Sequence, residues 1–194
     1  MDNLSEWVEE WALELGAGRP GAETITVYRR SVGQFLTWLA AHHPKVTTPA
    51  QLTRAHVRDW HAHLAEQGKA DATRRVRGIA LRKFLAYVVS EPDSGLDSNP
   101  AEGFELPVPQ AEPVPVISDA DLTKLIRSMS GNGFVDRRDT AIIRVLLDCG
   151  LRRAELVGID TDDLDLRHQQ ITVTGKGSKI RIVPFGGRTA LALR

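Results

Sequence analysis

The first ninety residues show the periodicity of amphipathic helices. Apolar side chains recur every three or four residues in four successive stretches, as one face of an α-helix requires. Glycines and prolines separate these stretches and are expected to end the helices. We therefore predict four helices within residues 4–90. Their apolar stripes consist of Leu4, Trp7, Val8, Trp11 and Leu15, then of Tyr28, Val32, Phe35, Leu36 and Leu39, then of Val57, Trp60 and Leu64, and lastly of Val76, Ala80, Phe84, Tyr87 and Val88.

Further helices are predicted in the second half of the chain. Ser118 precedes Asp119 and Asp121, so its hydroxyl is expected to cap a helix whose apolar face begins at Leu122. Another helical stretch runs from about residue 136 to residue 149 and ends at Gly150. A short helix is predicted to follow it over residues 152–158.

The period then changes from that of a helix to that of a strand. Apolar and polar residues alternate over residues 171–174 and again over residues 179–182. The glycine-containing sequence of residues 175–178 between them is typical of a turn, which predicts a β-hairpin. Residues 164–166 are candidates for a third strand. The predicted fold class is therefore mainly α with a small antiparallel β-sheet.

Prolines mark a boundary between two domains. Six of the ten prolines fall within residues 91–117. Proline lacks an amide donor and biases the preceding residue toward an extended conformation. We therefore predict an extended, proline-rich linker over residues 93–117, which separates a helical domain over residues 1–92 from a mixed domain over residues 118–194.

Composition argues against several classes of protein. No apolar stretch approaches the roughly 18 residues of a membrane span, and the acidic beginning of the chain is unlike a signal peptide. The single cysteine, Cys149, excludes an internal disulfide framework, so a cytoplasmic location is predicted. His56, His61 and His63 lie five and two residues apart on one helix, spacings that do not bring imidazoles together. We expect neither a metal nor another cofactor.

The net charge is zero, but the charges are segregated along the chain. Residues 24–90 contain 11 lysines and arginines and only three acidic residues. Because exposed charges are screened beyond about 10 Å, the local excess decides whether a phosphate is attracted. On the fourth helix, Arg74, Arg75 and Arg82 share the arc opposite the apolar stripe, which favours a helix that lies against a DNA duplex. A solvated basic face is the alternative interpretation.

Two short motifs in the second domain contain candidate catalytic residues. The sequence Gly-Leu-Arg-Arg-Ala-Glu over residues 150–155 places Arg152 at the start of a short helix, and Lys176 lies between two glycines at the hairpin tip. The planar fork of an arginine can hold two phosphate oxygens at once. Taken singly, Arg152 is also explained as a solvated residue near a helix end, and Lys176 as an ordinary turn residue.

The order of these features resembles the tyrosine recombinases, the phage-integrase and Xer-type enzymes. The resemblance begins with the helices and continues through Asn-Pro-Ala-Glu-Gly at 99–103, Leu-Pro at 106–107 and Val-Ile-Ser at 116–118 to the motifs of Arg152 and Lys176. No single tripeptide is specific to the family, but the ordered set is. The resemblance implies a four-helix SAM-like core-binding domain followed by an α+β catalytic domain.

Enzymes of this family cut DNA when a tyrosine attacks a phosphodiester, which gives a 3′-phosphotyrosyl link and releases a 5′-hydroxyl. By resemblance, Arg152 matches the first catalytic arginine, which stabilises the charge on the phosphate oxygens. Lys176 matches the hairpin lysine that acts as the general acid. Glu155 lies three residues after Arg152 on the same helical face and is expected to orient that helix or the guanidinium.

The resemblance also implies contacts with double-stranded DNA, the predicted partner. The residues expected to make them are Arg74, Arg75, Arg77, Arg82 and Lys83, with Arg29, Arg30, Lys69, Lys179 and Arg181 as weaker candidates. For Lys179 and Arg181, a role as strand-edge charges that favour solubility is the alternative. Neither a membrane nor a small-molecule substrate is expected. The full-length family would assemble as a tetramer on DNA.

One departure from the family pattern is that neither a His-x-x-Arg motif nor a tyrosine follows the hairpin. The only tyrosines, Tyr28 and Tyr87, are predicted to lie in the helical core. We therefore expect an incomplete catalytic domain, truncated before the last catalytic motifs, in a chain that binds DNA in site-specific recombination but cannot cleave it alone. A non-catalytic DNA-binding accessory protein and a helical protein-interaction module are the alternatives.

Overall fold

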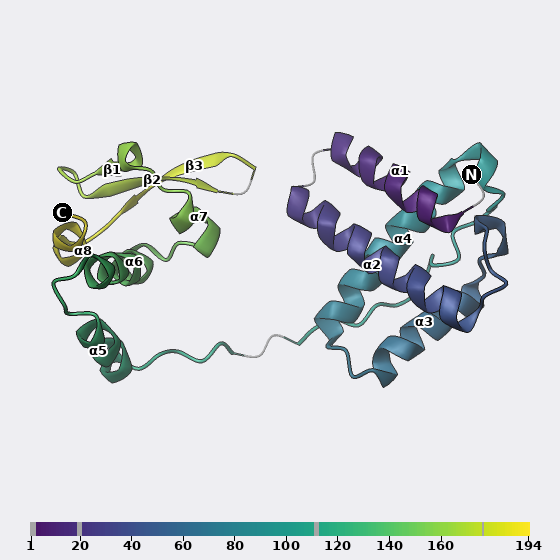
Figure 1. Cartoon of the computed structure of the whole chain (residues 1–194), viewed down its shortest axis with the longest axis horizontal. Coiled ribbons are helices and arrows are strands. Elements are labelled where there is room, and N and C mark those ends of the chain that lie inside the picture. Colours follow the sequence, from purple (N-terminus) through teal and green to yellow (C-terminus); the bar gives the residue numbers. More distant parts are fainter. Residues whose placement is uncertain (1–2, 19–20, 111–112, 176) are drawn as a thin grey trace. The chain divides into compact units, whose positions relative to one another are not determined.

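The computed structural model describes residues 3–18, 21–110, 113–175 and 177–194. The chain divides into two compact units, Met1–Glu112 and Pro113–Arg194. The first unit is helical, and the second combines helices with a small sheet (Figure 1). This confirms the predicted fold class, mainly α with a small antiparallel sheet.

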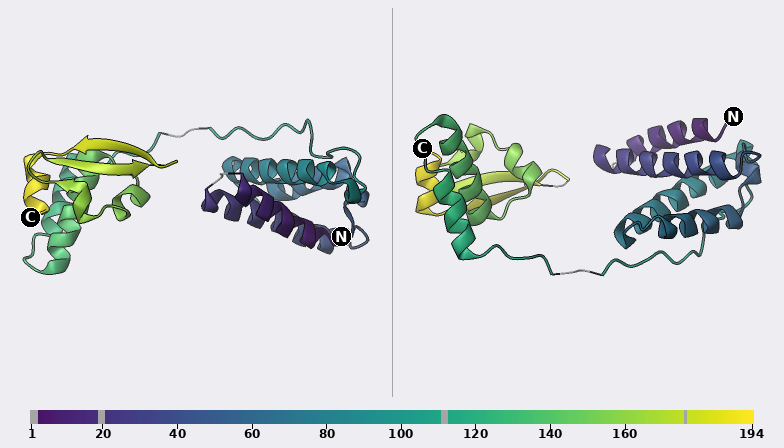
Figure 2. Two further views of the ribbon diagram at one scale, coloured as in Figure 1. Left: turned by 90° about the horizontal axis from the view of Figure 1, so that it is seen from above. Right: turned by 60° about the horizontal axis from the view of Figure 1, so that its bottom comes forward.

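The helical unit is built around α2, which packs against both α1 and α4 (Figures 1 and 2). Each helix corresponds to one of the predicted apolar stripes, because burial of that stripe stabilises the amphipathic segment. The elements of this unit are α1 (Leu4–Ala17), α2 (Ala22–His42), η1 (Pro49–Gln51), α3 (Arg54–Glu66), α4 (Asp71–Ser90) and η2 (Pro92–Ser94).

Aromatic side chains form much of the core of the helical unit. Trp11 packs edge-on against Phe84 with ring centroids 5.4 Å apart, and Phe35 packs edge-on against Trp60 at 5.9 Å. The prediction that Val76 of α4 lies in the core is wrong, because this residue is 38% exposed. The buried arc of α4 instead includes Gly78, Leu81 and Leu85, so the helix is turned relative to the predicted stripe.

The segment that follows α4 differs from the predicted extended linker over 93–117. Leu96 and Ala101 are buried in the core of the helical unit, and Phe104 packs against that core. The guanidinium of Arg54 lies over the Phe104 ring, 4.1 Å from its centroid. We call residues 95–107 the strap, because this stretch is bound to the helical unit along its length.

Two arginines of α4 hold the backbone of the strap. Nε of Arg82 donates to the carbonyl of Ala101 at 3.2 Å, and Nη2 of Arg82 donates to the carbonyl of Phe104. Nη1 of Arg75 donates to the carbonyl of Pro107 at 3.3 Å. In return, Nδ2 of Asn99 donates to the carbonyl of Arg82 at 3.0 Å. Part of the basic face predicted to meet DNA is thus used inside the protein.

The second unit contains a three-stranded antiparallel sheet in the order β1-β2-β3, with α6 packed against β3 and α8 (Figures 1 and 2). Its elements are α5 (Asp119–Ser128), α6 (Phe134–Cys149), α7 (Arg153–Val157), η3 (Thr161–Asp163), β1 (Leu164–Asp165), β2 (Gln170–Gly175), β3 (Lys179–Pro184) and α8 (Gly187–Ala192). The predicted cap forms, since Oγ of Ser118 accepts a hydrogen bond from the amide of Asp121 at 3.1 Å.

The inward face of β3 is the one that bears Arg181, and its two isoleucines lie on the outward face. Val173 of β2, which is buried, pairs with Arg181 of β3, so the two side chains lie on the same face of the sheet. Ile180 and Ile182 are instead 70% and 63% exposed. Arg181 therefore points to the same face of the sheet as Val173, where its side chain is 41% exposed and pairs with Glu155.

The core of the second unit is small. Val145, Leu151, Ile171, Val173 and Phe185 are its larger buried apolar residues. The helix α5 contains no buried residue, although its sequence has an apolar stripe. No helix in the described part of the chain is both long and apolar enough to cross a membrane.

Replacement of Arg82 by alanine should destabilise the helical unit. It would leave the carbonyls of Ala101 and Phe104 without their charged donor, at a cost of about 1.5–3 kcal/mol. All four tryptophans of the chain lie in the helical unit, so fluorescence during urea unfolding reports on this unit alone. Arg58→Ala is the matched control: this exposed arginine pairs only with its neighbour Asp59 among the described residues. An unfolding midpoint equal to that of the control would contradict the role of Arg82.

Candidate functional site

The turn between α6 and α7 places Arg152 at the start of a helix. Gly150 ends α6 in the left-handed region with φ of 58°, a conformation that glycine adopts without steric cost. Leu151 is buried in the core and fixes the turn to the second unit. Arg152 is the N-cap residue of α7 and has an extended backbone.

Glu155 fixes the backbone and the side chain of Arg152 together. Its carboxylate accepts a hydrogen bond from the backbone amide of Arg152 at 2.9 Å and another from Nη1 of Arg152 at 3.0 Å. The side chain of Glu155 is only 5% exposed, whereas that of Arg152 is 79% exposed. The guanidinium is therefore held at one nitrogen and presents its remaining donors to solvent.

The same carboxylate also binds Arg181 of β3. Nη1 of Arg181 donates to Oε1 of Glu155 at 2.8 Å, and Nη2 donates to Oε2 at 2.9 Å. This bidentate geometry is the strongest that an arginine forms with a carboxylate. Hydrogen bonds from Arg181, and next those from the Arg152 amide, lower the pKa of Glu155 from 4.5 to about 2. The cluster is thus one carboxylate between two guanidinium groups, with an excess of positive charge.

The end of β2 lies against this cluster. A methyl group at position 175 would be 3.3 Å from Oε1 of Glu155 and 3.4 Å from Nη1 of Arg181, so glycine allows the ion pair to approach the strand. Gly175 directly precedes Lys176 in the sequence. Lys176 itself, the predicted general acid, lies outside the described residues.

The structure distinguishes among the basic residues predicted to contact DNA. Arg29 pairs with Glu9 at 2.6 Å, and Arg74 pairs with Asp71 at 3.1 Å. Arg75 and Arg82 hold the strap, and Arg181 holds Glu155. In the described part of the chain, no side-chain ion pair or hydrogen bond engages the remaining candidates, which are Arg30, Lys69, Arg77, Lys83 and Lys179.

A histidine cluster lies where α2 ends beside α3. Helical spacing within α3 gave no sign of it, because its members come from two helices. The rings of His43 and His56 have centroids 4.7 Å apart, and those of His42 and His63 are 5.5 Å apart. Burial and then the nearby His43 lower the pKa of His56. No group of three or more His, Cys, Asp or Glu residues within the described ranges is arranged to hold a metal ion.

Comparisons with known protein families match both units. The model of the phage integrase N-terminal SAM-like domain matches residues 8–92. The model of the phage integrase family matches residues 116–194. Together they cover most of α1, all of α2 to α4 and most of the second unit, including the cluster around Glu155.

Curated relatives are tyrosine recombinases. The chain is 32% identical over 192 residues to tyrosine recombinase XerC of Pseudomonas syringae pv. syringae, which covers 98% of the chain and 62% of that protein. It is 31% identical over 171 residues to XerC of Haemophilus influenzae, which covers 88% of the chain and 56% of that protein. The chain thus spans about three fifths of the length of these relatives.

Solved structures with the same fold include three integrases or recombinases bound to DNA. The Tn1549 transposon integrase in complex with transposon right end DNA has a TM-score of 0.72 at 18% identity, over 98% of this chain and 63% of that one. A lambda integrase dimer bound to a core site has a TM-score of 0.71 at 12% identity, over 94% and 49%. XerH bound to its palindromic difH substrate has a TM-score of 0.69 at 18% identity, over 97% and 55%.

The carboxyl group of Glu155 should titrate near pH 2. Because its pKa is lower in the folded protein than the ordinary value of 4.5, its ion pairs stabilise the second unit fully above pH 4.5. That stabilisation should be lost as the pH falls from 4.5 toward 2. Carbon-13 NMR of the Glu155 carboxyl measures this titration directly.

Arg181→Ala should raise the pKa of Glu155 toward its ordinary value, because the hydrogen bonds from Arg181 are the largest cause of the shift. Arg153→Ala serves as the control: Arg153 is exposed and lies next to Arg152 in the same helix. A Glu155 titration midpoint near 4.5 in the unsubstituted protein would contradict the described cluster.

Proposed function

The chain belongs to the phage integrase family of tyrosine recombinases, and on this basis we propose that it binds DNA for site-specific recombination and supplies part of the catalytic site. The observation on which this proposal rests is the arrangement of Arg152 and Glu155. A buried carboxylate fixes an exposed guanidinium at the start of α7, within the matched family segment. A guanidinium held in this way is suited to bind a phosphate group.

Double-stranded DNA is the proposed partner. The Tn1549 integrase and XerH structures contain DNA, and they share the fold of this chain. The basic excess of residues 24–90 favours the same kind of partner for the helical unit. Assembly of full-length members of the family as a tetramer on DNA is likewise proposed, as the family resemblance implies.

The proposed role of Arg152 is to stabilise the phosphate during strand cleavage. When a tyrosine attacks the phosphodiester, negative charge increases on the non-bridging oxygens, and a preorganised donor lowers the barrier. Nη1 of Arg152 is bound to Glu155, so Nε and Nη2 remain to donate to these oxygens. By resemblance, Lys176 protonates the 5′-oxygen that leaves.

These 194 residues are proposed to bind DNA without cleaving it by themselves. Both tyrosines belong to the helical unit, where Tyr28 stacks on Trp11 with ring centroids 6.4 Å apart. Burial, followed by the nearby Glu91, Glu10 and Glu14, raises the pKa of Tyr87. A raised pKa disfavours the phenolate, so Tyr87 is poorly suited to act as the nucleophile.

DNA binding by the full chain should weaken steeply with salt. Each phosphate neutralised by a lysine or arginine releases condensed counterions, so affinity for a mixed-sequence duplex should fall sharply between about 50 and 200 mM salt. Fluorescence anisotropy measures this dependence. An affinity that does not depend on salt, or no DNA binding, would instead favour a protein-interaction module.

Incubation with a nicked suicide substrate should give no covalent protein–DNA adduct on a denaturing gel.

Arg152→Ala should weaken DNA binding about tenfold, the effect of losing roughly 1.4 kcal/mol from charged hydrogen bonds to a phosphate. Arg153→Ala is the matched control and should change the affinity less, because Glu155 does not orient its side chain among the described contacts. Equal affinities of the Arg152→Ala variant and the unsubstituted protein would favour an accessory DNA-binding protein that uses only the helical unit. NMR spectra of the second unit establish that the variants fold.

A further inference from the structure

A groove of about 410 Å³ lies between α2 and α4 on the helical unit. Arg30 of α2 and Arg77 of α4 line it from opposite helices, together with the polar side chains of Ser31, Gln34 and Thr73. No aspartate or glutamate is among its lining residues. The groove therefore combines two positive charges with neutral hydrogen-bonding groups.

The two arginines in this groove are close enough to repel each other. Burial lowers the pKa of Arg77, and the positive charge of Arg30 lowers it further. Within the described ranges, neither guanidinium forms an ion pair with a carboxylate. Because arginine stays protonated, the repulsion persists until an anion enters the groove.

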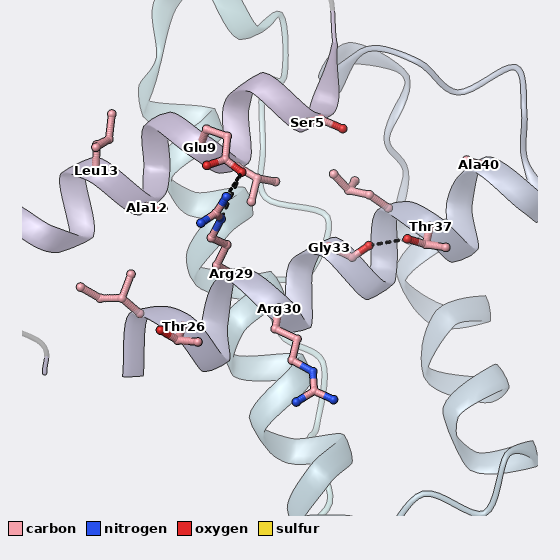
Figure 3. Close-up of a pocket in the computed structure, with 13 residues that line it drawn as sticks. Ser5, Glu9, Ala12, Leu13, Thr26, Arg29, Arg30, Gly33, Thr37 and Ala40 are labelled. Atoms are coloured by element: carbon pink, nitrogen blue, oxygen red, sulfur yellow. Dashed lines mark hydrogen bonds and ion pairs between the residues drawn. The ribbon is translucent and has the colours of Figure 1, made fainter. Parts of the chain in front are cut away.

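Arg29, the residue before Arg30 in α2, has its charge neutralised by a carboxylate of α1. Nε and Nη2 of Arg29 both donate to Oε1 of Glu9 in α1, at 3.1 and 2.6 Å. Figure 3 shows that Arg29 reaches Glu9, whereas Arg30, the next residue, points away from it. The sequence of α2 thus directs one arginine to an internal carboxylate and leaves the other for the groove beside α4.

A backbone phosphate of DNA fits this groove better than a base edge. A phosphate oxygen pair accepts hydrogen bonds from guanidinium groups, and its negative charge removes the repulsion between Arg30 and Arg77. A neutral base edge would accept hydrogen bonds but would leave that repulsion in place. Gln34 and Thr73 can supply further neutral donors of the kind that commonly contact phosphates, whereas the hydroxyl of Ser31 already donates to the carbonyl of Val27 at 2.7 Å.

We propose that Arg30 and Arg77 together bind one backbone phosphate of double-stranded DNA. This inference rests on the proposed DNA-binding function and assigns part of it to one site. Among the arginines of α2 and α4, the charge available for DNA is then that of the groove. The charges of Arg29, Arg74, Arg75 and Arg82 are directed to partners inside the protein.

The test compares alanine variants in the full chain by their affinity for a mixed-sequence DNA duplex. Arg30→Ala and Arg77→Ala should each weaken binding about tenfold, because each removes charged hydrogen bonds to the phosphate. Arg29→Ala is the matched control: it lies next to Arg30 but is already paired with Glu9, and it should leave the affinity nearly unchanged. Tryptophan fluorescence during unfolding reports whether each variant keeps a folded helical unit.

The salt dependence of binding tests whether the two arginines share one phosphate. Loss of one phosphate contact should reduce the slope of log affinity against log salt by about 0.9. The double variant should show this single reduction and no more. A reduction twice as large would mean two separate phosphates and would overturn the proposal, as would an Arg30→Ala variant that behaves like Arg29→Ala. If the unsubstituted chain binds no DNA, the proposed function itself fails.

Discussion

The carboxylate of Glu155 joins two parts of the second unit that are 26 residues apart in the sequence. It receives the backbone amide and one guanidinium nitrogen from Arg152, and two nitrogens from Arg181. These bonds attach α7 to β3 and set the direction in which the Arg152 side chain leaves the helix. Because the side chain of Glu155 is only 5% exposed, loss of Arg181 would leave its charge with the two hydrogen bonds from Arg152 and little access to water.

In the helical unit, some arginines donate hydrogen bonds to backbone carbonyls, while others lie at the surface. Arg82 and Arg75 bind carbonyl groups of the strap, so positive charge that looks available in the sequence is placed against the protein's own main chain. A positive segment therefore does not translate directly into a positive surface. The electrostatic field at the DNA-facing surface depends on which guanidinium groups lack a partner inside the protein, and tertiary contacts determine those partners.

The elements of the fold were predictable because they depend on local patterns. The stripes of α1 to α4 and the alternation around Gly175 each require only a period, and the period is visible in the sequence. The partners of long side chains were not predictable, since Arg82 and Arg181 bind groups about twenty residues away or more. The alternating pattern of β3 did not show which of its two faces points inward. Arg181 lies on the inward face, where it pairs with Glu155, and Ile180 lies on the outward face. Arg152, the candidate catalytic arginine, and Glu155, its expected supporting residue, lie within hydrogen-bond distance of each other, and their roles in catalysis stay predictions.

The position of β3 at the margin of the sheet has a consequence for the behaviour of the protein in solution. In the described part of the sheet β3 pairs on one side only, so its other side offers free amide and carbonyl groups. The outward face of the same strand bears Ile180 and Ile182. An apolar strand with an open edge is a template for intermolecular strand addition. We expect concentrated samples of this chain to self-associate through β3 and a β-strand of a neighbouring molecule.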